Sequence, residues 1–452
     1  MSATQTVLVD DLVDRQSLTK RNYFILGLLL AALLCDGFDL QIVAFAAPRL
    51  AKLWNLAPSS FLQYVQSANL LGMMLGATFL GNLGDRHGRK RLIVAGTLLY
   101  AVMALLCVFV QNPTQLALLR FLTGLGLGGV LPNVIALTAE ISPTAQRARL
   151  TSIPMIGMSL GSGLPAVVAA WLVPQFGWQA LFIAGGCVPI LVALLIAWKL
   201  PESILFLTFR HLRRDEIVAR ARELRPGIAI TPDTQLALRV KPGAQSRGTI
   251  ADLFAGGLKL TTPLLWLMFA CTLLSMHFLN SWVTVILNQA GLSEVQTAFT
   301  NGALHWGGAI AAVCTVFLLG RMGLNLALAL LLLGFAGCFI IASTGFASAP
   351  LLTFAICVAG FGIIGCQGVL NAAAGLIYPV SCRPTGVGAA LGIGRIGSLS
   401  GPLVGGYILA QHWPSQNMFY VPLLPLAIAA VATLILMLRG VDIRGTSGSA
   451  TH

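Results

Sequence analysis

Apolar runs of membrane-spanning length constrain the fold of this 452-residue chain more than any other feature. A helix needs about 20 apolar residues to cross the roughly 30 Å hydrocarbon core of a bilayer. Twelve such runs lie near residues 24–48, 61–82, 91–111, 115–139, 150–173, 178–199, 261–288, 296–319, 323–344, 348–377, 386–410 and 417–438. Hydrophobic residues make up 57% of the chain and charged residues only 10%, which leaves too little polar surface for a soluble protein. The sequence therefore predicts an all-α polytopic membrane protein.

The distribution of Lys and Arg predicts the orientation of these helices. Residues 1–19 are polar and acidic, so we expect no cleavable signal and a first run that stays as a helix. If the N-terminus is cytoplasmic, 24 of the 28 Lys and Arg residues fall on that side of the membrane. The exceptions are Arg49 and Lys52 at the outer end of the first run, and Arg120 and Arg395 inside apolar runs. We expect both termini to be cytoplasmic, and this topology explains the net charge of +13 without a nucleic-acid partner.

A charged segment divides the runs into six and six. It reads LPESILFLTFRHLRRDEIVARARELRPG, carries its charges at helical spacing and ends at Pro226-Gly227. We predict an N-terminal six-helix half over residues 1–199, a cytoplasmic linker over 200–260 and a C-terminal six-helix half over 261–452.

Weak internal similarity favours a duplication of the two halves. A shift of 240 residues lays Gly157 on Gly397 and Gly161 on Gly401, and a shift of 235 lays Arg86-His87-Gly88 on Arg321-Met322-Gly323. A shift of 238 lays Gly124 on Gly362 and Asn133 on Asn371. Parallel, pseudo-symmetric halves are one of the two symmetries of secondary transporters, and they place a central site between the halves.

Motifs for catalysis or metal binding are missing from the sequence. The nine Cys residues lie almost entirely in apolar runs and form no CxxC pair or metal spacing. The chain contains no HExxH and no phosphate-binding glycine loop after a strand. We therefore expect neither an enzyme nor a bound metal or organic cofactor.

The most specific motif is GNLGDRHGRKR, from Gly81 to Arg91, in the short connection after the second run. It resembles the loop signature of the major facilitator superfamily, of form GxLaDrxGRkxxl. The resemblance implies the major facilitator fold and a cytoplasmic gating latch between the halves. The residues that match the latch are Gly81, Gly84, Asp85, Arg86, Gly88 and Arg89. The counterpart in the second half, LLGRMGLN, lacks the aspartate and most of the basic residues.

Four further stretches resemble the aromatic acid:proton symporters within that superfamily. They are DGFD at Asp36, RFLTGLGLGGVLPN at Arg120, GCQGVL at Gly365 and RPTGVGAALGIGRIGSLSGP at Arg383. The resemblance implies a monomeric secondary transporter in a bacterial inner membrane, which imports a small aromatic carboxylic acid by proton symport through alternating access. Protons are then the only coupling ion.

Asp36 and Asp39 are the candidate proton carriers. A carboxylate near the bilayer centre costs about 2.5–3.5 kcal/mol on insertion scales, so two in one helix predict a function. At 100° per residue the two side chains point about 60° apart, toward one face, where we expect an aqueous cavity. Burial and a neighbouring like charge both disfavour ionisation, which suits proton binding. Gly37 between them allows a neighbouring helix or the substrate to approach, or the helix to bend.

Three further charged residues are grouped with proton coupling or substrate binding. Arg395 lies about ten residues into its run, too deep to snorkel easily, and its fork fits either a substrate carboxylate or Asp36 or Asp39. The superfamily resemblance assigns Arg120 to proton coupling, although a structural role fits the sequence equally well. Glu140 lies near Arg147 and Arg149, where an ion pair competes with a proton-coupling role.

Polar and aromatic residues of the second half are the candidate wall of an aromatic substrate site. They are His277, Asn280, Trp282, His305, Trp306, Gln367, Asn371 and Tyr378. Each residue alone fits ordinary packing or an interhelical hydrogen bond, and only the group predicts a site. His277 and His305 are also candidates for proton relay.

Other functions remain open on the sequence. A proton-coupled antiporter of the same fold usually carries GxxxGPxxGG in the fifth run, whereas here that string begins at Gly397 in the eleventh and the fifth reads GMSLGSGLP. This position favours symport. A sugar or sugar-acid carrier shares the gating signature, but paired aspartates and a deep arginine suit a proton-coupled aromatic anion better. A non-transporting sensor would be expected to add a soluble output domain.

Overall fold

The protein is a bundle of long helices in the computed structural model. The structure describes residues 6–14, 16, 18–56, 58–143, 146–210, 214–224, 234–237, 250–346, 348–379, 382–411, 413–441 and 443. The long helices of the first half are α2 (Lys20–Leu53), α3 (Pro58–His87), α4 (Arg89–Leu106), α5 (Pro113–Glu140), α6 (Arg147–Trp171) and α8 (Gln179–Lys199). Those of the second half are α11 (Leu258–Gln289), α12 (Glu294–Met322), α13 (Leu324–Thr344), α14 (Ala349–Ile377), α15 (Arg383–Ala410) and α16 (Leu423–Leu438).

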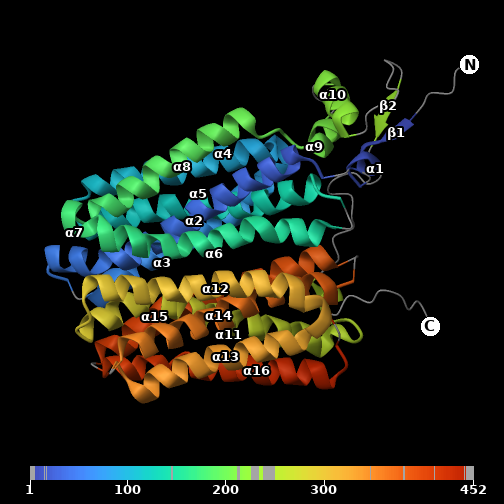
Figure 1. The fold of residues 1–452 in the computed structure, drawn as a ribbon. Helices are drawn as coiled ribbons and strands as arrows, with labels where there is room; N and C mark the ends of the chain where they lie inside the picture. Colours follow the sequence, from blue (N-terminus) through green and yellow to red (C-terminus); the bar gives the residue numbers. More distant parts are fainter. Residues whose placement is uncertain are drawn as a thin grey trace, which may run out of the picture.

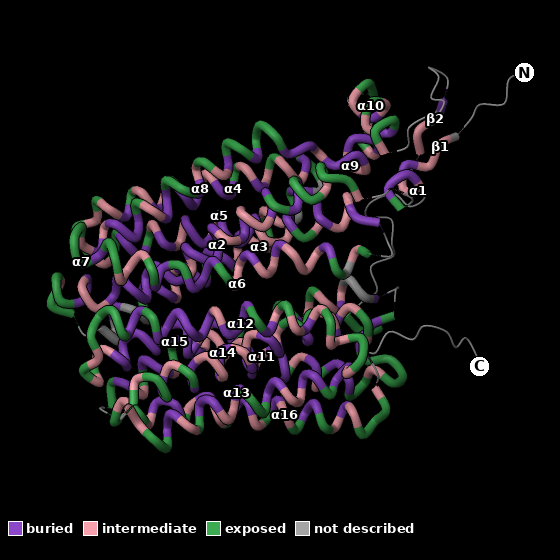
Figure 2. The backbone as a smooth tube through the Cα atoms, in the orientation of Figure 1, coloured by how far each residue is buried: buried purple, intermediate pink, exposed green. Residues whose placement is uncertain are grey.

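The two halves form two layers that lie side by side (Figure 1). Helices α2, α3 and α6 of the first half face α11, α12 and α15 of the second. Exposed residues run along outer helices such as α8 and α13, while buried residues follow α2 and α5 (Figure 2). At the end opposite the linker, Arg49 joins the halves because it pairs with Glu294 of α12 (Nη2 to Oε2, 2.6 Å). It also donates to the carbonyl of Val173 in its own half (2.8 Å).

The twelve predicted runs coincide with these helices, which confirms the fold class. Among the described residues, eleven helices are long and apolar enough to cross a membrane. The remaining long helix, α3, spans 30 residues but carries more polar side chains, such as Gln66, Ser67 and Asn69. Gln66 and Asn69 are buried inside the bundle and not on its outer surface.

The linker contains short elements at one end of the first half. Helix α10 (Arg214–Leu224) is present where charges repeat at helical spacing, and the uncharged helix α9 (Ile204–Phe209) precedes it. The predicted end at Pro226-Gly227 lies outside the described residues. The sequence did not predict β1 (Thr6–Leu8), which pairs in parallel with β2 (Gln235–Ala237) beside α1 (Val9–Asp14). This small sheet joins the N-terminal segment to the linker (Figure 1).

Glycine contacts show how the halves correspond. Gly157 and Gly161 of α6 each meet a carbonyl of α2, and their predicted equivalents Gly397 and Gly401 of α15 each meet a carbonyl of α11. The shift of 240 residues therefore describes the same helix crossing in both halves.

The predicted shift of 238 residues is wrong for the fourth and tenth runs. Gly124 of α5 meets the carbonyl of Asn69 on α3, and the matching contact in the second half joins Gly360 of α14 to the carbonyl of Leu304 on α12. The equivalent of Gly124 is therefore Gly360, which lies 236 positions later, and not Gly362, which packs on α13. Glycine-rich helices align in several registers by sequence alone, and only the helix contacts decide between them.

Gly37 sets the crossing of α2 and α6. A side chain at this position would overlap the carbonyl oxygen of Met158 and come within 2.9 Å of the backbone nitrogen of Ser162. Of the sequence alternatives for Gly37, the structure supports close approach of a neighbouring helix. This contact fixes the helix that carries both aspartates.

We predict that Gly37→Ala destabilises the protein by about 1–3 kcal/mol, the usual cost of overpacking, because backbone atoms of α6 must move away. Gly27→Ala in the same helix is the control, since a side chain there meets no heavy atom within 4 Å. Thermal unfolding in detergent, followed by loss of helical circular dichroism, measures both variants. Equal unfolding midpoints for the two variants would contradict the close contact of Gly37 with the backbone of α6.

Candidate functional site

A buried ion pair between α2 and α5 forms the centre of the first half. Arg120 binds both carboxylate oxygens of Asp39, with distances of 3.0 Å from Nη1 to Oδ1 and 2.7 Å from Nη2 to Oδ2. Its Nη2 also donates to the backbone carbonyl of Asp39 at 3.1 Å. Both side chains are fully buried. This bidentate geometry makes the pair a strong, charge-assisted interaction.

The helix that carries Arg120 has a well-defined start. Pro113 occupies the first turn of α5, and the side chain of the preceding Asn112 accepts a hydrogen bond from the backbone N–H of Gln115 (2.9 Å). Arg120 follows two turns later and points into the bundle, so it does not snorkel outward. The sequence offered Asp36 and Asp39 as possible partners of Arg395. In the structure, Asp39 is instead paired with Arg120.

Asp36 lies beside this pair and has no basic partner among the described residues. It is almost fully buried, its Oδ1 accepts no hydrogen bond within the described part of the chain, and the hydroxyl of Tyr100 on α4 lies next to the carboxylate. Asp36 and Asp39 are close enough to interact. The expected aqueous cavity is not where the aspartates point, because both lie in the interior of the first half.

Sequence reasoning missed Tyr100. Its side chain is fully buried between α4 and α5, with Gly126 closely packed against it. The available signal was a phenol inside the apolar run 91–111. A single tyrosine in such a run is common, and only the fold shows that it faces Asp36.

Arg395 is the second charged centre, and it lies near the middle of α15. The residue is partly exposed, and among the described residues its side chain forms neither a hydrogen bond nor an ion pair. His277 of α11 lies close enough to experience its charge. Asp39 is bound to Arg120, so it is not the partner of Arg395 that the sequence offered.

Several predicted wall residues on α11 and α12 carry buried polar atoms. Oδ1 of Asn280, Nε1 of Trp282 and Nε2 of His305 have no hydrogen-bond partner among the described residues. His277 is partly buried, and its Nδ1 lies 3.0 Å from the carbonyl of Leu273. Buried polar atoms normally find partners, so unpaired ones in a group favour a ligand or water.

The aromatic residues of this group pack on glycines. The indole of Trp282 lies against Gly405 of α15. That of Trp306 lies against Gly163 of α6, so it reaches across to the first half. Trp306 therefore sits where the two halves meet.

The remaining wall residues lie toward the linker end. Gln367 donates weakly to Asn371 on the same helix (3.4 Å), and Asn371 is exposed. Tyr378 lies at the end of α14, packed on Gly386 and beside Thr262. Thr262 precedes His277 by 15 residues on α11, a rise of about 22 Å, so the structure separates Tyr378 from the other candidates.

The gating motif is helical rather than a loop, which corrects the sequence expectation. Helix α3 continues to His87, α4 begins at Arg89, and only Gly88 between them leaves helical geometry, with φ of 101°. This positive φ explains the need for glycine. A side chain at Gly84 would overlap Asn133 of α5, and one at Gly81 would approach Pro132.

Glu140 pairs with Arg89 of this motif, not with Arg147 or Arg149. The distance from Arg89 Nε to Glu140 Oε1 is 3.1 Å, and the pair is partly buried. Arg147 instead lies 3.7 Å from Asp14. Arg86 is exposed, and the side chain of Asp85 lies outside what the structure describes. The packing of Gly84 on α5 and the pair of Arg89 with Glu140 join α3, α4 and α5 within the first half.

Comparison with known proteins identifies the family. The sequence profile of the Major Facilitator Superfamily matches residues 29–390 and again 265–451. The chain belongs to the Major Facilitator Superfamily. It is thus a multi-pass membrane transporter and not an enzyme, as the gating motif predicted.

Individual members of the superfamily resemble the whole chain. A gallate transporter of Pseudomonas putida is 33% identical over 426 residues, covering 94% of each protein. The 4-hydroxybenzoate transporter PcaK of Pseudomonas aeruginosa is 33% identical over 444 residues, covering 96% of this chain and 97% of that protein. The solved proton:xylose symporter XylE shares the fold, with a TM-score of 0.70 at 14% identity over 94% of this chain and 97% of XylE.

We predict that Arg120→Gln destabilises the protein by about 3–5 kcal/mol, because Asp39 is then a buried charge without a partner. The double variant Asp39→Asn with Arg120→Gln should lose less than the sum of the two single variants. Unfolding midpoints in detergent measure this cycle. Arg49→Gln is the control: its ion pair with Glu294 is partly exposed, so about 0–1 kcal/mol is expected. Additive losses in the cycle would show that the pair does not act as a unit.

Proposed function

We propose that this transporter imports an aromatic carboxylate together with a proton by alternating access. The observation that carries the proposal is Arg395, a guanidinium in the middle of a membrane helix that is paired with no carboxylate among the described residues. A cation at this depth is costly unless an anion accompanies it. A substrate carboxylate supplies that anion, and the planar fork of arginine holds it bidentately.

Neighbouring groups favour an aromatic, oxygen-bearing substrate. Asn280 and His305 have buried polar atoms that lack partners among the described residues, which suits ring hydroxyls. The indole ring of Trp306, at the contact between the halves, adds an apolar aromatic surface. The relatives named for gallate and 4-hydroxybenzoate support this substrate class. Gln367 and Asn371 then lie on the path toward the linker end.

Asp36 is the proposed proton site. Asp39 is neutralised by Arg120, whereas Asp36 has the hydroxyl of Tyr100 and a second carboxylate nearby. A proton on Asp36 removes an uncompensated buried charge, which lowers the free energy of the closed bundle. Protons are thus the only coupling ion in this mechanism.

Alternating access then requires contacts at the two ends to break in turn. Arg49 and Glu294 hold the halves together at the end opposite the linker, so this pair must open when substrate enters from that side. At the linker end, Arg89 and Glu140 stabilise the gating motif. We place the protein in the inner membrane as a single chain with both termini cytoplasmic.

We predict that purified protein in proteoliposomes accumulates labelled 4-hydroxybenzoate under an inward proton gradient. A gradient of one pH unit is worth about 1.4 kcal/mol, so one-for-one coupling allows up to about tenfold accumulation. Gallate should compete, and xylose should not. Proton-driven loss of preloaded substrate, or no response to the gradient, would exclude symport.

We expect Arg395→Gln to weaken 4-hydroxybenzoate binding by at least about 30-fold, because a partly buried charge pair is lost. Arg395→Lys keeps the charge but not the planar fork, so its affinity should lie between those of the unmodified protein and Arg395→Gln. Isothermal titration in detergent measures the affinities, with exposed Arg321→Gln as the control. If Arg395→Gln binds as the unmodified protein does, the substrate carboxylate lies elsewhere.

For Asp36→Asn, we expect gradient-driven accumulation to disappear while exchange of internal for external substrate continues, since asparagine cannot carry the proton. Counterflow in proteoliposomes separates the two activities, and Asp252→Asn at an exposed position is the control. Accumulation by Asp36→Asn at the level of the unmodified protein would assign coupling to another residue.

A further inference from the structure

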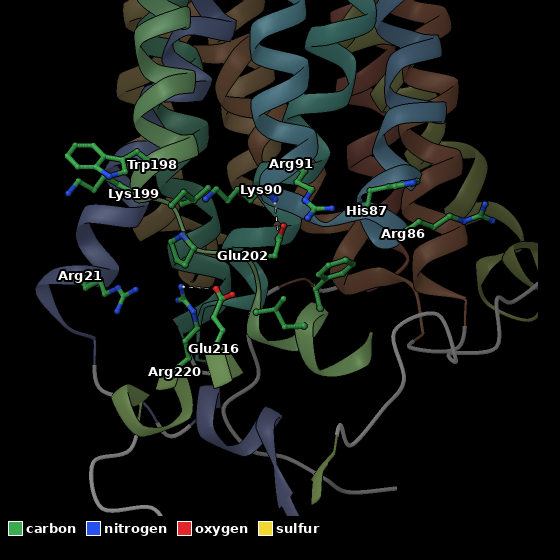
Figure 3. Close-up of a pocket in the computed structure, with 14 residues that line it drawn as sticks. Arg21, Arg86, His87, Lys90, Arg91, Trp198, Lys199, Glu202, Glu216 and Arg220 are labelled. Atoms are coloured by element: carbon green, nitrogen blue, oxygen red, sulfur yellow. Dashed lines mark hydrogen bonds and ion pairs between the residues drawn. The ribbon is translucent and has the colours of Figure 1, made fainter. Parts of the chain in front are cut away.

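A basic pocket lies at the linker end of the first half, away from the transport site. It has a volume of about 460 Å³ and is formed where α2, α4, α8 and the linker helices meet. Six Lys and Arg side chains line it: Arg21, Arg86, Lys90, Arg91, Lys199 and Arg220. Figure 3 shows Lys90 and Arg91 near Glu202, with Arg220 and Glu216 approaching from the linker side and Arg86 and His87 at the far edge.

The carboxylates of this pocket are already engaged. Glu202 accepts from the backbone N–H groups of Lys90 (3.2 Å) and Ser203 (3.1 Å), and Glu216 lies 3.7 Å from Arg220. Arg21 pairs with Glu223. For Arg91, no ion pair is present within the described ranges. The pocket thus holds more positive charge than its acidic residues balance.

Arg220 lies in surroundings that disfavour its charge, chiefly because it is partly buried. Burial lowers the pKa of its guanidinium, and the positive charge of Arg21 lowers it further. An anion in the pocket would stabilise both charges. The positive-inside rule accounts for cations at this end, but it does not require them to surround one cavity.

Exposed aromatic residues place the pocket at the membrane surface. Trp198 lies at the end of α8 and is 74% exposed, and Tyr23 and Phe24 follow Arg21 on α2 with 57% and 52% exposure. Nζ of Lys199 lies 3.6 Å from the centre of the Trp198 ring. Such aromatic residues concentrate at the level of lipid headgroups. The pocket therefore opens beside lipid-facing surface and not only toward the aqueous phase.

We propose that this pocket binds the phosphate of an anionic phospholipid headgroup, whose acyl chains lie along the aromatic surface of α2 and α8. Basic pockets between membrane helices on the cytoplasmic side bind such headgroups, and the linker end is the cytoplasmic side in the proposed topology. The bound lipid would join α2, α4 and α8 to the linker helix α10. A soluble phosphate shares the headgroup chemistry, but the aromatic surface beside the pocket gives it no additional contact.

The test compares phosphatidylglycerol, phosphatidylcholine and inorganic phosphate as ligands of the full-length protein in a nonionic detergent. Native mass spectrometry counts retained lipid, and the thermal midpoint reports stabilisation. The variant is Lys199→Gln with Arg220→Gln. The control, Lys259→Gln with Arg439→Gln, removes two exposed charges from the linker end of the second half.

We expect phosphatidylglycerol to be retained and to raise the midpoint, and phosphatidylcholine and inorganic phosphate to do neither. Each cation near the surface contributes about fivefold, so the pocket variant should bind about 30-fold more weakly, and the control should bind normally. Equal binding by the two double variants would overturn the site. Stabilisation by inorganic phosphate but not by phosphatidylglycerol would overturn the lipid as its occupant.

Discussion

The ion pair of Asp39 and Arg120 is the interaction on which the first half depends. Each of these charges alone would cost several kcal/mol in the membrane interior, and together they form a closed, bidentate unit without exposed surface. The pair ties α2 to α5, while Gly37 brings α2 against α6. The helix that carries Asp36 is thus fixed by contacts on two sides. Within the described part of the chain Asp36 remains a buried carboxylate without a cation.

The second half presents the opposite charge. Arg395 has no carboxylate within the described residues, and it lies near His277 and among helices with unpaired polar atoms. One half then holds an unpaired acid and the other an unpaired base. In the proposed mechanism a proton neutralises the buried acid and a substrate carboxylate pairs with the partly exposed guanidinium, so neither charge is left uncompensated. This complementarity explains in physical terms why a proton and an organic anion would cross together.

The sequence predicted the helices well because twenty-residue apolar runs have few alternative structures. It also singled out four charged residues inside the bundle, since Asp36, Asp39, Arg120 and Arg395 each interrupt an apolar run; their roles in transport stay predictions. It could not predict the pairing, because an arginine's partner depends on which helices touch. The same limit explains Glu140, which pairs with Arg89 instead of its near neighbours in sequence, and Tyr378, which shares composition with the other wall residues but lies at a different depth. The predicted equivalence of Asn133 and Asn371 in the two halves was wrong, because glycine-rich helices align in more than one register by sequence alone.

Substrate binding at Arg395 and proton binding at Asp36 are linked in the proposed mechanism. Proton uptake during binding tests this linkage most directly: 4-hydroxybenzoate is added to purified protein in weakly buffered detergent solution, and the pH change is recorded. We predict proton uptake by the unmodified protein, and binding without uptake by Asp36→Asn. Uptake of the same size by Asp36→Asn would contradict the linkage.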